Sequence, residues 1–152
     1  MPMPWTYRHA TKEWRAFLDD VKERMALESD NMSYTAVDGV LQVFRRRLTA
    51  QQGLLFAGVL PSVLRAIFVK GWDVSELPIP FEERQVLADE VKQVRVNHKL
   101  TPDNAIEATA WAIRRCTDSR DFERVLTQLP DEALAFWHGD FKDLTELDQR
   151  II

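Results

Sequence analysis

The sequence predicts an all-α protein of two tandem four-helix units, with about eight main helices, related by a pseudo-twofold axis and sharing one core. The first observation is that the stretch from Tyr34 to Phe68 recurs without a gap at an offset of 69 residues. A fixed offset over so long a window is typical of a duplicated supersecondary unit. The second is that apolar residues recur at helical spacing, and no run alternates apolar and polar residues as a half-buried strand would.

The offset relates the two units position by position. The matched pairs include Ala36 and Ala105, Arg45 and Arg114, Arg46 and Arg115, Leu60 and Leu129, Pro61 and Pro130, and Phe68 and Trp137. We therefore expect a single domain over residues 1–152, with residues 11–71 as the first helical repeat and residues 81–138 as the second. Residues 72–80 contain two prolines and no helical spacing, so they are the expected connector. Residues 139–152 are expected to form a C-terminal tail or a short helix.

The first unit is expected to follow an extended arm, residues 1–10, which carries Trp5 and Tyr7. Thr11 offers an N-cap oxygen to the first helix, whose apolar stripe ends near Leu27.

The next helices of this unit are delimited by capping residues. Ser33 or Asn31 is the expected N-cap of the second helix, which ends in three consecutive arginines. Thr49 and Gln52 predict a capping box for the third helix. Pro61 stops that helix and suits the first turn of the fourth.

The second unit repeats this order with smaller side chains. A Thr-Pro-Asp sequence at residues 101–103 is typical of a helix start, Asp118 is the expected cap of the next helix, and residues 130–132 open the last one. Thr109 and Ala110 stand where the first unit has larger residues. This stripe should therefore pack more closely or be less deeply buried, and a cleft would open most easily there.

Composition and charge narrow the class of protein. The net charge of -4 and the pI near 5.4 disfavour nucleic-acid binding, which usually needs a basic excess. Cys116 is the only cysteine, so no intramolecular disulfide forms. The first residues do not resemble a secretory signal, and no apolar run approaches the roughly 20 residues of a membrane helix. We expect a cytoplasmic protein without a membrane partner.

No group of residues predicts catalysis, a metal site or a cofactor. His9, His98 and His138 have no second histidine or cysteine at ligand spacing. Cys116 lies beside two arginines, which would favour a reactive thiolate, but a lone cysteine is more commonly buried packing. Nucleophile motifs and glycine-rich phosphate loops are missing. We assign no catalytic residue, metal ligand or cofactor, and favour a role without enzymatic activity.

Arginines at the ends of equivalent helices are the best candidates for a binding site. Arg45 and Arg46 in the first unit match Arg114 and Arg115 in the second. If the clusters meet near a pseudo-twofold axis, they would form an anion-binding patch. The alternative is that they complement the helix dipole or pair with acids of their own helices.

Two of the five tryptophans are candidate interface residues. Trp5 and Trp72 lie in segments without helical spacing, whereas the others lie on or beside apolar stripes. Exposed aromatic side chains are enriched at protein interfaces. The alternative for Trp72 is that it fills the junction between the two units.

Part of the chain resembles a known family. A Leu-Pro step at residues 60–61, a short apolar helix and then Gly-Trp at residues 71–72 resemble the bacterial family called domain of unknown function 2267. The helix and capped turn of residues 36–49 are similar to the same family. The likeness covers about residues 13–138, although the second unit has His-Gly-Asp at residues 138–140 in place of Gly-Trp. The resemblance implies an all-helical fold and no established activity, so no site residue is carried over.

Two hypotheses for function follow. The leading one is a non-enzymatic soluble helical module that acts through protein–protein contacts, as a homo-oligomer or with another protein partner. The alternative is a small anionic-ligand binding protein or an enzyme, with a site between the two repeats that uses Arg46 and Arg115.

Overall fold

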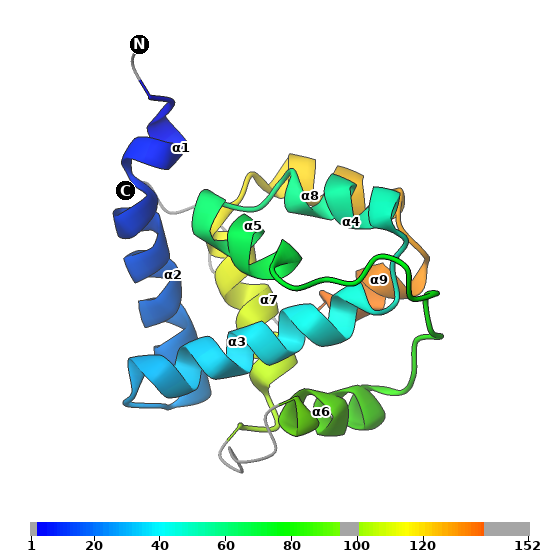
Figure 1. Cartoon of the computed structure of the whole chain (residues 1–152). Coiled ribbons are helices and arrows are strands. Elements are labelled where there is room, and N and C mark those ends of the chain that lie inside the picture. Colours follow the sequence, from blue (N-terminus) through cyan, green and yellow to red (C-terminus); the bar gives the residue numbers. More distant parts are fainter. Residues whose placement is uncertain (1–2, 95–100, 139–152) are drawn as a thin grey trace.

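The computed structural model describes residues 3–94 and 101–138, and in this part of the chain the secondary structure consists of helices with no strand (Figure 1). Its helices are α1 (Trp5–Arg8), α2 (Ala10–Met25), α3 (Asp30–Arg45), α4 (Ala50–Ala57), α5 (Ser62–Val69), α6 (Arg84–Gln93), α7 (Ala105–Cys116), α8 (Ser119–Thr127) and α9 (Glu132–Phe136). The prediction of an all-α fold is therefore confirmed. Within these residues, no helix is both long and apolar enough to cross a membrane.

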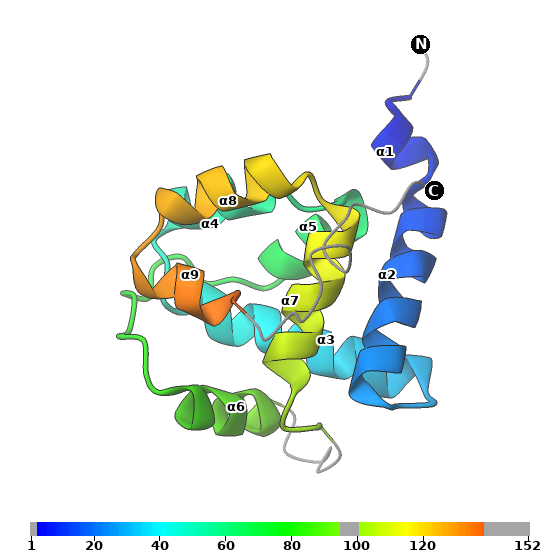
Figure 2. The ribbon, with the colours of Figure 1, turned by 180° about the vertical axis from the view of Figure 1, so that it is seen from behind.

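The packing order links the two halves of the chain. The first long helix, α2, packs against α7 as well as against its neighbour α3, and α6 packs in turn against α3 (Figures 1 and 2). At one end of the molecule α4 and α8 lie side by side. The helices of the two expected units thus share one body. The internal duplication itself stays a prediction from the sequence.

Several predicted caps are present. The Thr49 hydroxyl accepts a hydrogen bond from the Gln52 amide at 3.2 Å, and the Gln52 side chain accepts one from the Thr49 amide at 2.8 Å. The Asp118 carboxylate caps α8 by accepting from the amides of Arg120 and Asp121. Both caps satisfy amides that the first turn of a helix leaves unpaired.

Other expected boundaries in the first unit are wrong by a few residues. Ser29 caps α3 by accepting from the Met32 amide at 3.2 Å, so Ser33 and Asn31 lie inside the helix. A side chain caps best from the residue just before the first turn, and Ser29 is the one with an extended backbone there. Pro61 is likewise the N-cap residue of α5, one position before its first turn.

The N-terminal arm is also different from the prediction. Residues 5–8 form the short helix α1 rather than extended chain, because the Pro4 carbonyl accepts hydrogen bonds from the amides of Tyr7 and Arg8 at 3.0 and 3.1 Å. α2 follows at once from Ala10, so Thr11 lies in its first turn and is not its N-cap. The predicted tail or helix over residues 139–152 lies outside the described residues.

The helix expected to start at residues 101–103 begins slightly later. α7 starts at Ala105 after Asn104, and the Ala105 amide bonds to the Pro102 carbonyl at 3.2 Å to close a turn. The Asn104 side chain donates to the Arg24 carbonyl at 3.0 Å. This bond ties the start of α7 to the end of α2.

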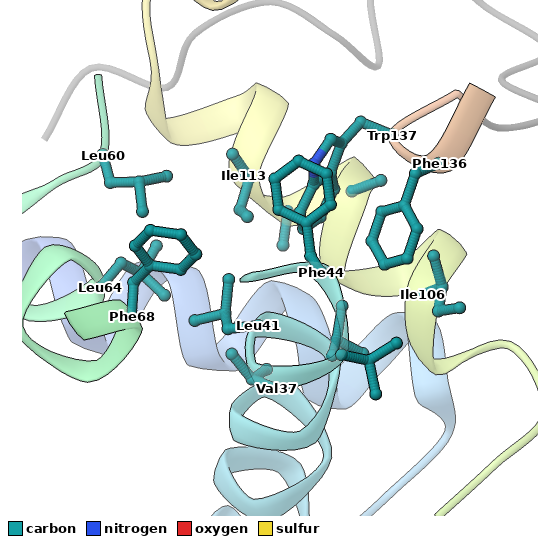
Figure 3. Packing of buried hydrophobic residues seen from close by; sticks show 14 of the residues in the cluster. Val37, Leu41, Phe44, Leu60, Leu64, Phe68, Ile106, Ile113, Phe136 and Trp137 are labelled. Atoms are coloured by element: carbon teal, nitrogen blue, oxygen red, sulfur yellow. The ribbon is translucent and has the colours of Figure 1, made fainter. Parts of the chain in front are cut away.

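Aromatic side chains form the centre of the core, and Figure 3 shows Phe44, Phe136 and Trp137 among them. Trp137 is fully buried, and the centroid of its ring lies 5.1 Å from Phe44, 5.4 Å from Phe56 and 4.9 Å from Phe136. Phe122 of α8 closes the same cluster. Because one indole contacts rings from α3, α4, α8 and α9, it connects elements from both halves of the chain.

The small residues of α7 are buried as deeply as any in the protein. Thr109 and Ala110 have no exposed surface, so the expectation of shallower burial is wrong and no cleft opens at these positions. The other expectation, closer packing, agrees with the extensive contact of α7 with α2. Small side chains let two helix backbones approach, which fills the space that larger residues would occupy.

Thr109→Val is expected to raise the free energy of unfolding by about 1 kcal/mol, because an unpartnered buried hydroxyl carries a desolvation cost that a methyl group does not. The Thr109 hydroxyl makes no hydrogen bond within the described residues. Urea denaturation measures the change. The matched control is Val40→Thr, at the equivalent buried position of α3, which should lower stability by a similar amount. Unchanged or lower stability in Thr109→Val would show that the hydroxyl is satisfied.

Candidate functional site

The three consecutive arginines at the end of α3 have different partners. Arg45 is buried, and its Nη1 donates to the carbonyls of Phe68 and Lys70, both at 2.9 Å. These carbonyls belong to the last turn and C-cap of α5, where backbone acceptors lack partners within the helix. Desolvation by burial lowers the pKa of Arg45. Arg45 thus caps the end of α5.

Arg46 and Arg47 converge on one carboxylate of α6. Arg47 Nη2 lies 2.6 Å from Glu90 Oε2, and Arg46 Nη1 lies 2.9 Å from Glu90 Oε1. Partial burial would raise the pKa of Glu90, but the hydrogen bonds from Arg47 and Arg46 outweigh it and hold the pKa below its ordinary value. Arg47 also donates to the carbonyls of Val43 and Pro80 at 2.8 and 3.2 Å. It therefore joins α3, α6 and the end of the connector.

The two arginines of α7 have corresponding structural contacts. Arg114 is buried, and its Nε and Nη2 donate to the Trp137 carbonyl at 3.1 and 3.0 Å, at the end of α9. Arg115 Nε pairs with Asp20 Oδ2 of α2 at 3.2 Å. Its guanidinium also lies 4.9 Å from the centroid of the Trp111 ring, a cation–π contact.

Within the described residues, the four arginines of the candidate anion site do not line one common hollow. Arg45 and Arg46 line a hollow beside the connector, and Arg114 lines another beside α9. Arg115 faces α2. Anion binding by this set stays a prediction, and only the first pair shares a cavity.

The hollow beside the connector brings Trp72 together with two of the candidate arginines. Its volume is about 230 Å³. It is lined by Gln42, Arg45, Arg46, Leu48, Gly71, Trp72, Asp73, Glu76, Leu77 and Ile79. We call Arg46, Trp72, Val74, Leu77 and Ile79, which surround or adjoin it, the connector surface. Residues 70–83 between α5 and α6 contain no helix, and the predicted connector, residues 72–80, lies within them.

Backbone contacts hold the connector against the body. The Ile79 amide donates to the Arg46 carbonyl at 3.1 Å. Asp73 accepts from the amide and hydroxyl of Ser75 at 3.0 and 2.6 Å, which closes a turn and lowers the pKa of its carboxyl. Gly71 has a φ of 70°, a left-handed conformation that favours glycine and reverses the chain after α5. The connector therefore presents its side chains from a defined backbone.

Apolar side chains of this surface face solvent. Leu77 is 85% exposed, and Val74 and Ile79 are also exposed. Trp72 is half-buried, with its ring centroid 5.8 Å from that of Phe68. Clustered exposed apolar residues beside an aromatic ring and an arginine are typical of protein interfaces.

Trp5, the other candidate interface residue, lies elsewhere. Its ring is about half exposed and its centroid is 4.7 Å from that of His9. It borders a different hollow, which Cys116 also lines. The Cys116 thiol donates to the Ile113 carbonyl at 3.3 Å. The two tryptophans thus mark separate surfaces.

A comparison with known protein families identifies the chain. Residues 14–136 match the family described as "Uncharacterized conserved protein (DUF2267)". The chain belongs to this family. The match extends from α2 to the last residue of α9 and includes the whole connector surface, but not Trp5. A search of the curated proteins finds no match.

The DUF2267 description gives no activity, so a candidate site depends on the side chains of this chain alone. Among the described residues, no three potential metal ligands lie close enough to hold an ion. His9 and His138 are described, whereas His98 and the acid of the His-Gly-Asp sequence are outside the described part. Arg47 was expected only as a member of the arginine run at the end of α3, and Leu77 was not predicted as a candidate. The only signal for Leu77 is an apolar residue before a proline in a segment without helical spacing.

Gly53→Ala is expected to displace Trp72 from α4 in this DUF2267 chain. A methyl group at Gly53 would overlap the Trp72 ring, which is half-buried and has room to swing into solvent. Tryptophan emission should therefore shift to longer wavelength. The free energy of unfolding should change by less than about 1 kcal/mol, because the cost of displacing the ring is offset by the higher helix propensity of alanine, which exceeds that of glycine by a similar amount. Gly58→Ala, where a methyl group makes only ordinary contacts, is the control and should leave the emission unchanged. An unshifted spectrum for Gly53→Ala would place Trp72 away from α4.

Proposed function

We propose that the chain is a non-enzymatic helical module that binds protein, and that the connector surface is where the partner docks. The observation that carries this proposal is Leu77, whose side chain is 85% exposed although its backbone is held between Gly71 and the Ile79–Arg46 hydrogen bond. Covering an exposed apolar side chain with a partner removes it from water, and this burial favours binding.

The neighbours of Leu77 support the same interpretation. Tryptophan and arginine are the side chains that most often dominate binding energy at protein interfaces. Trp72 and Arg46 both border the hollow that Leu77 lines. Arg46 is 40% exposed at its side chain and uses one nitrogen for Glu90, so the rest of its guanidinium remains available to a partner. The surface thus combines an apolar centre with a polar rim.

A second copy of the chain is the first partner to test. We expect light scattering to give a molar mass above that of the 17.7 kDa monomer as protein concentration rises. Leu77→Glu should return the protein to a monomer, because it buries a charge at the centre of the contact. Val86→Glu, on an exposed apolar position of α6, is the matched control and should associate like the wild type. If the wild type stays a monomer at every concentration, self-association is excluded. Binding to a different protein is then the remaining form of the proposal.

Binding of a small anion is the second candidate function. The supporting observation is that Arg45 and Arg46 line the same hollow of about 230 Å³. Against it, Arg45 donates to two backbone carbonyls, and Asp73 and Glu76 line the same hollow. A rise in melting temperature with phosphate or a dicarboxylate that disappears in Arg46→Gln would favour this function. No shift with either anion would count against it.

A further inference from the structure

A second hollow is lined by Trp5, the other candidate interface tryptophan, and shares no residue with the connector surface. It is bordered by α1, by α2, by the link between α4 and α5, and by the start of α8. Its volume is about 390 Å³, within the size range of small-molecule sites. We call it the arm hollow, defined by Trp5, Thr6, Glu13, Arg65, Asp118 and Arg124 among its lining residues.

Glu13 is a buried carboxylate in the lining of the arm hollow. The residue is only 8% exposed although it carries a carboxylate. Its Oε1 accepts one hydrogen bond, from the Thr6 hydroxyl at 3.1 Å. No cationic group of the described residues lies within ion-pair distance of it. Because buried charges in proteins are ordinarily paired, this carboxylate is suited to a cation that none of the described residues supplies.

The cations at the border of the hollow have other partners. Arg65 donates to the carbonyls of Ala57 and Leu60 at 3.0 and 3.1 Å, at the end of α4. Arg124 pairs with Asp121 at 2.8 Å. The lining contains three carboxylates and two guanidinium groups, so it has one net negative charge. A monocation would neutralise it.

Trp5 adds a surface for the apolar part of such a cation. Its side chain is half exposed and borders the same hollow, adjacent in sequence to the Thr6 that bonds Glu13. An alkyl chain that covers an exposed indole removes apolar surface from water, which adds to the ion pair of its ammonium group. A carboxylate beside an exposed indole is therefore a combination that selects organic amines over metal ions.

From these contacts we propose that the arm hollow binds a small aliphatic amine, whose ammonium pairs with Glu13 and whose alkyl chain lies on Trp5. The remaining oxygen of the Glu13 carboxylate accepts from the ammonium, while Thr6 holds the first. The proposal is independent of the connector surface, so either can fail without the other.

Calorimetric titration with n-butylamine at neutral pH and low salt tests the proposal, with n-butanol as the uncharged analogue. We expect saturable binding of the amine, with a Kd of about 1 mM or tighter, and none of the alcohol. Glu13→Gln keeps the shape of the side chain and an acceptor for Thr6, and should weaken binding at least tenfold. Trp5→Ala, at an exposed position, should also weaken it. Asp19→Asn removes an exposed carboxylate of the same helix and should bind like the wild type.

Three outcomes would overturn the proposal. The first is no saturable heat with n-butylamine. The second is equal affinity in Glu13→Gln and the wild type. The third is an equal loss in Asp19→Asn, which would show attraction to the overall negative charge rather than to Glu13.

Discussion

Replacing Arg47 with alanine is expected to lower the free energy of unfolding by about 3 kcal/mol, because it removes the strongest donor to the partly buried Glu90 carboxylate and the side-chain donor to two backbone carbonyls. The guanidinium binds Glu90 at 2.6 Å and also reaches the carbonyls of Val43 and Pro80. Its side chain is 2% exposed, so water cannot replace these bonds without local opening. Urea denaturation, with the same slope for both proteins, measures the loss.

Arg46→Ala is the matched control for this prediction. Arg46 bonds the same Glu90 but its side chain is 40% exposed, and exposed ion pairs contribute at most about 1 kcal/mol. The effects of Arg47→Ala and Arg46→Ala on the unfolding equilibrium constant should therefore differ by more than a factor of ten. Equal losses in the two variants would contradict the role of Arg47 as the clamp of α3, α6 and the connector.

The Arg47–Glu90 pair also predicts a pH dependence. Because the pKa of Glu90 is lowered in the folded protein, its contribution is present above the ordinary carboxyl pKa of 4.5 and is lost as pH falls through the lowered value. Arg47→Ala removes the strongest of the donors that lower this pKa. The variant should therefore lose less stability than the wild type when pH is reduced below 4.5. A larger loss of stability in the variant than in the wild type on acidification would contradict this role of the Arg47–Glu90 pair.

Replacing Trp137 with alanine is expected to cost about 3–5 kcal/mol, as large-to-small changes of buried aromatic residues do. The indole is fully buried among Phe44, Phe56 and Phe136, so the surrounding rings would line a cavity that they cannot all close. Thermal and urea unfolding measure the loss.

Trp137→Phe is the matched comparison for this position. It keeps a ring in the cluster and removes an indole Nε1 that has no hydrogen-bond partner among the described residues, so it should cost clearly less than alanine. If both variants are equally destabilised, the indole nitrogen has a partner that the packing does not show. If neither is, Trp137 is not at the centre of the core.

Local features of this fold are readable in the sequence because their causes are local. The Thr49–Gln52 capping box and the Asp118 cap each depend on residues two or three positions apart, and both form as predicted. The all-helical class follows from spacing that every helix must have to bury one face. Here the physical cause and the sequence signal coincide.

The arginines show what could not be predicted. Three consecutive and chemically identical arginines end α3 in three different environments. Arg45 caps α5, Arg46 is partly exposed, and Arg47 is buried and pairs with Glu90. Their partners outside α3 lie 23 to 44 positions away in sequence, and the Arg115–Asp20 pair spans 95. Which direction each side chain takes depends on the rotation of α3 and α7 within the body. Helical spacing gives the buried face but not the neighbour that covers it.

The same reason explains why Leu77 was missed. Its exposure is a consequence of how the connector is fastened by Ile79 and Pro80 to the end of α3, and these bonds join distant parts of the chain. Trp72, by contrast, was predicted as an interface candidate because it is an aromatic residue in a segment without helical spacing. The structure adds that Trp72 and Leu77 border one hollow.

Photo-crosslinking from position 77 tests the central claim most directly, that the connector surface binds protein. A benzophenone amino acid at Leu77 should form a defined protein adduct, and unlabelled wild type should compete for it while Leu77→Glu does not. The same group at Val86, exposed on α6, should form no such adduct. Equal labelling from both positions, or an adduct that wild type and Leu77→Glu suppress equally, would contradict a binding role for this surface.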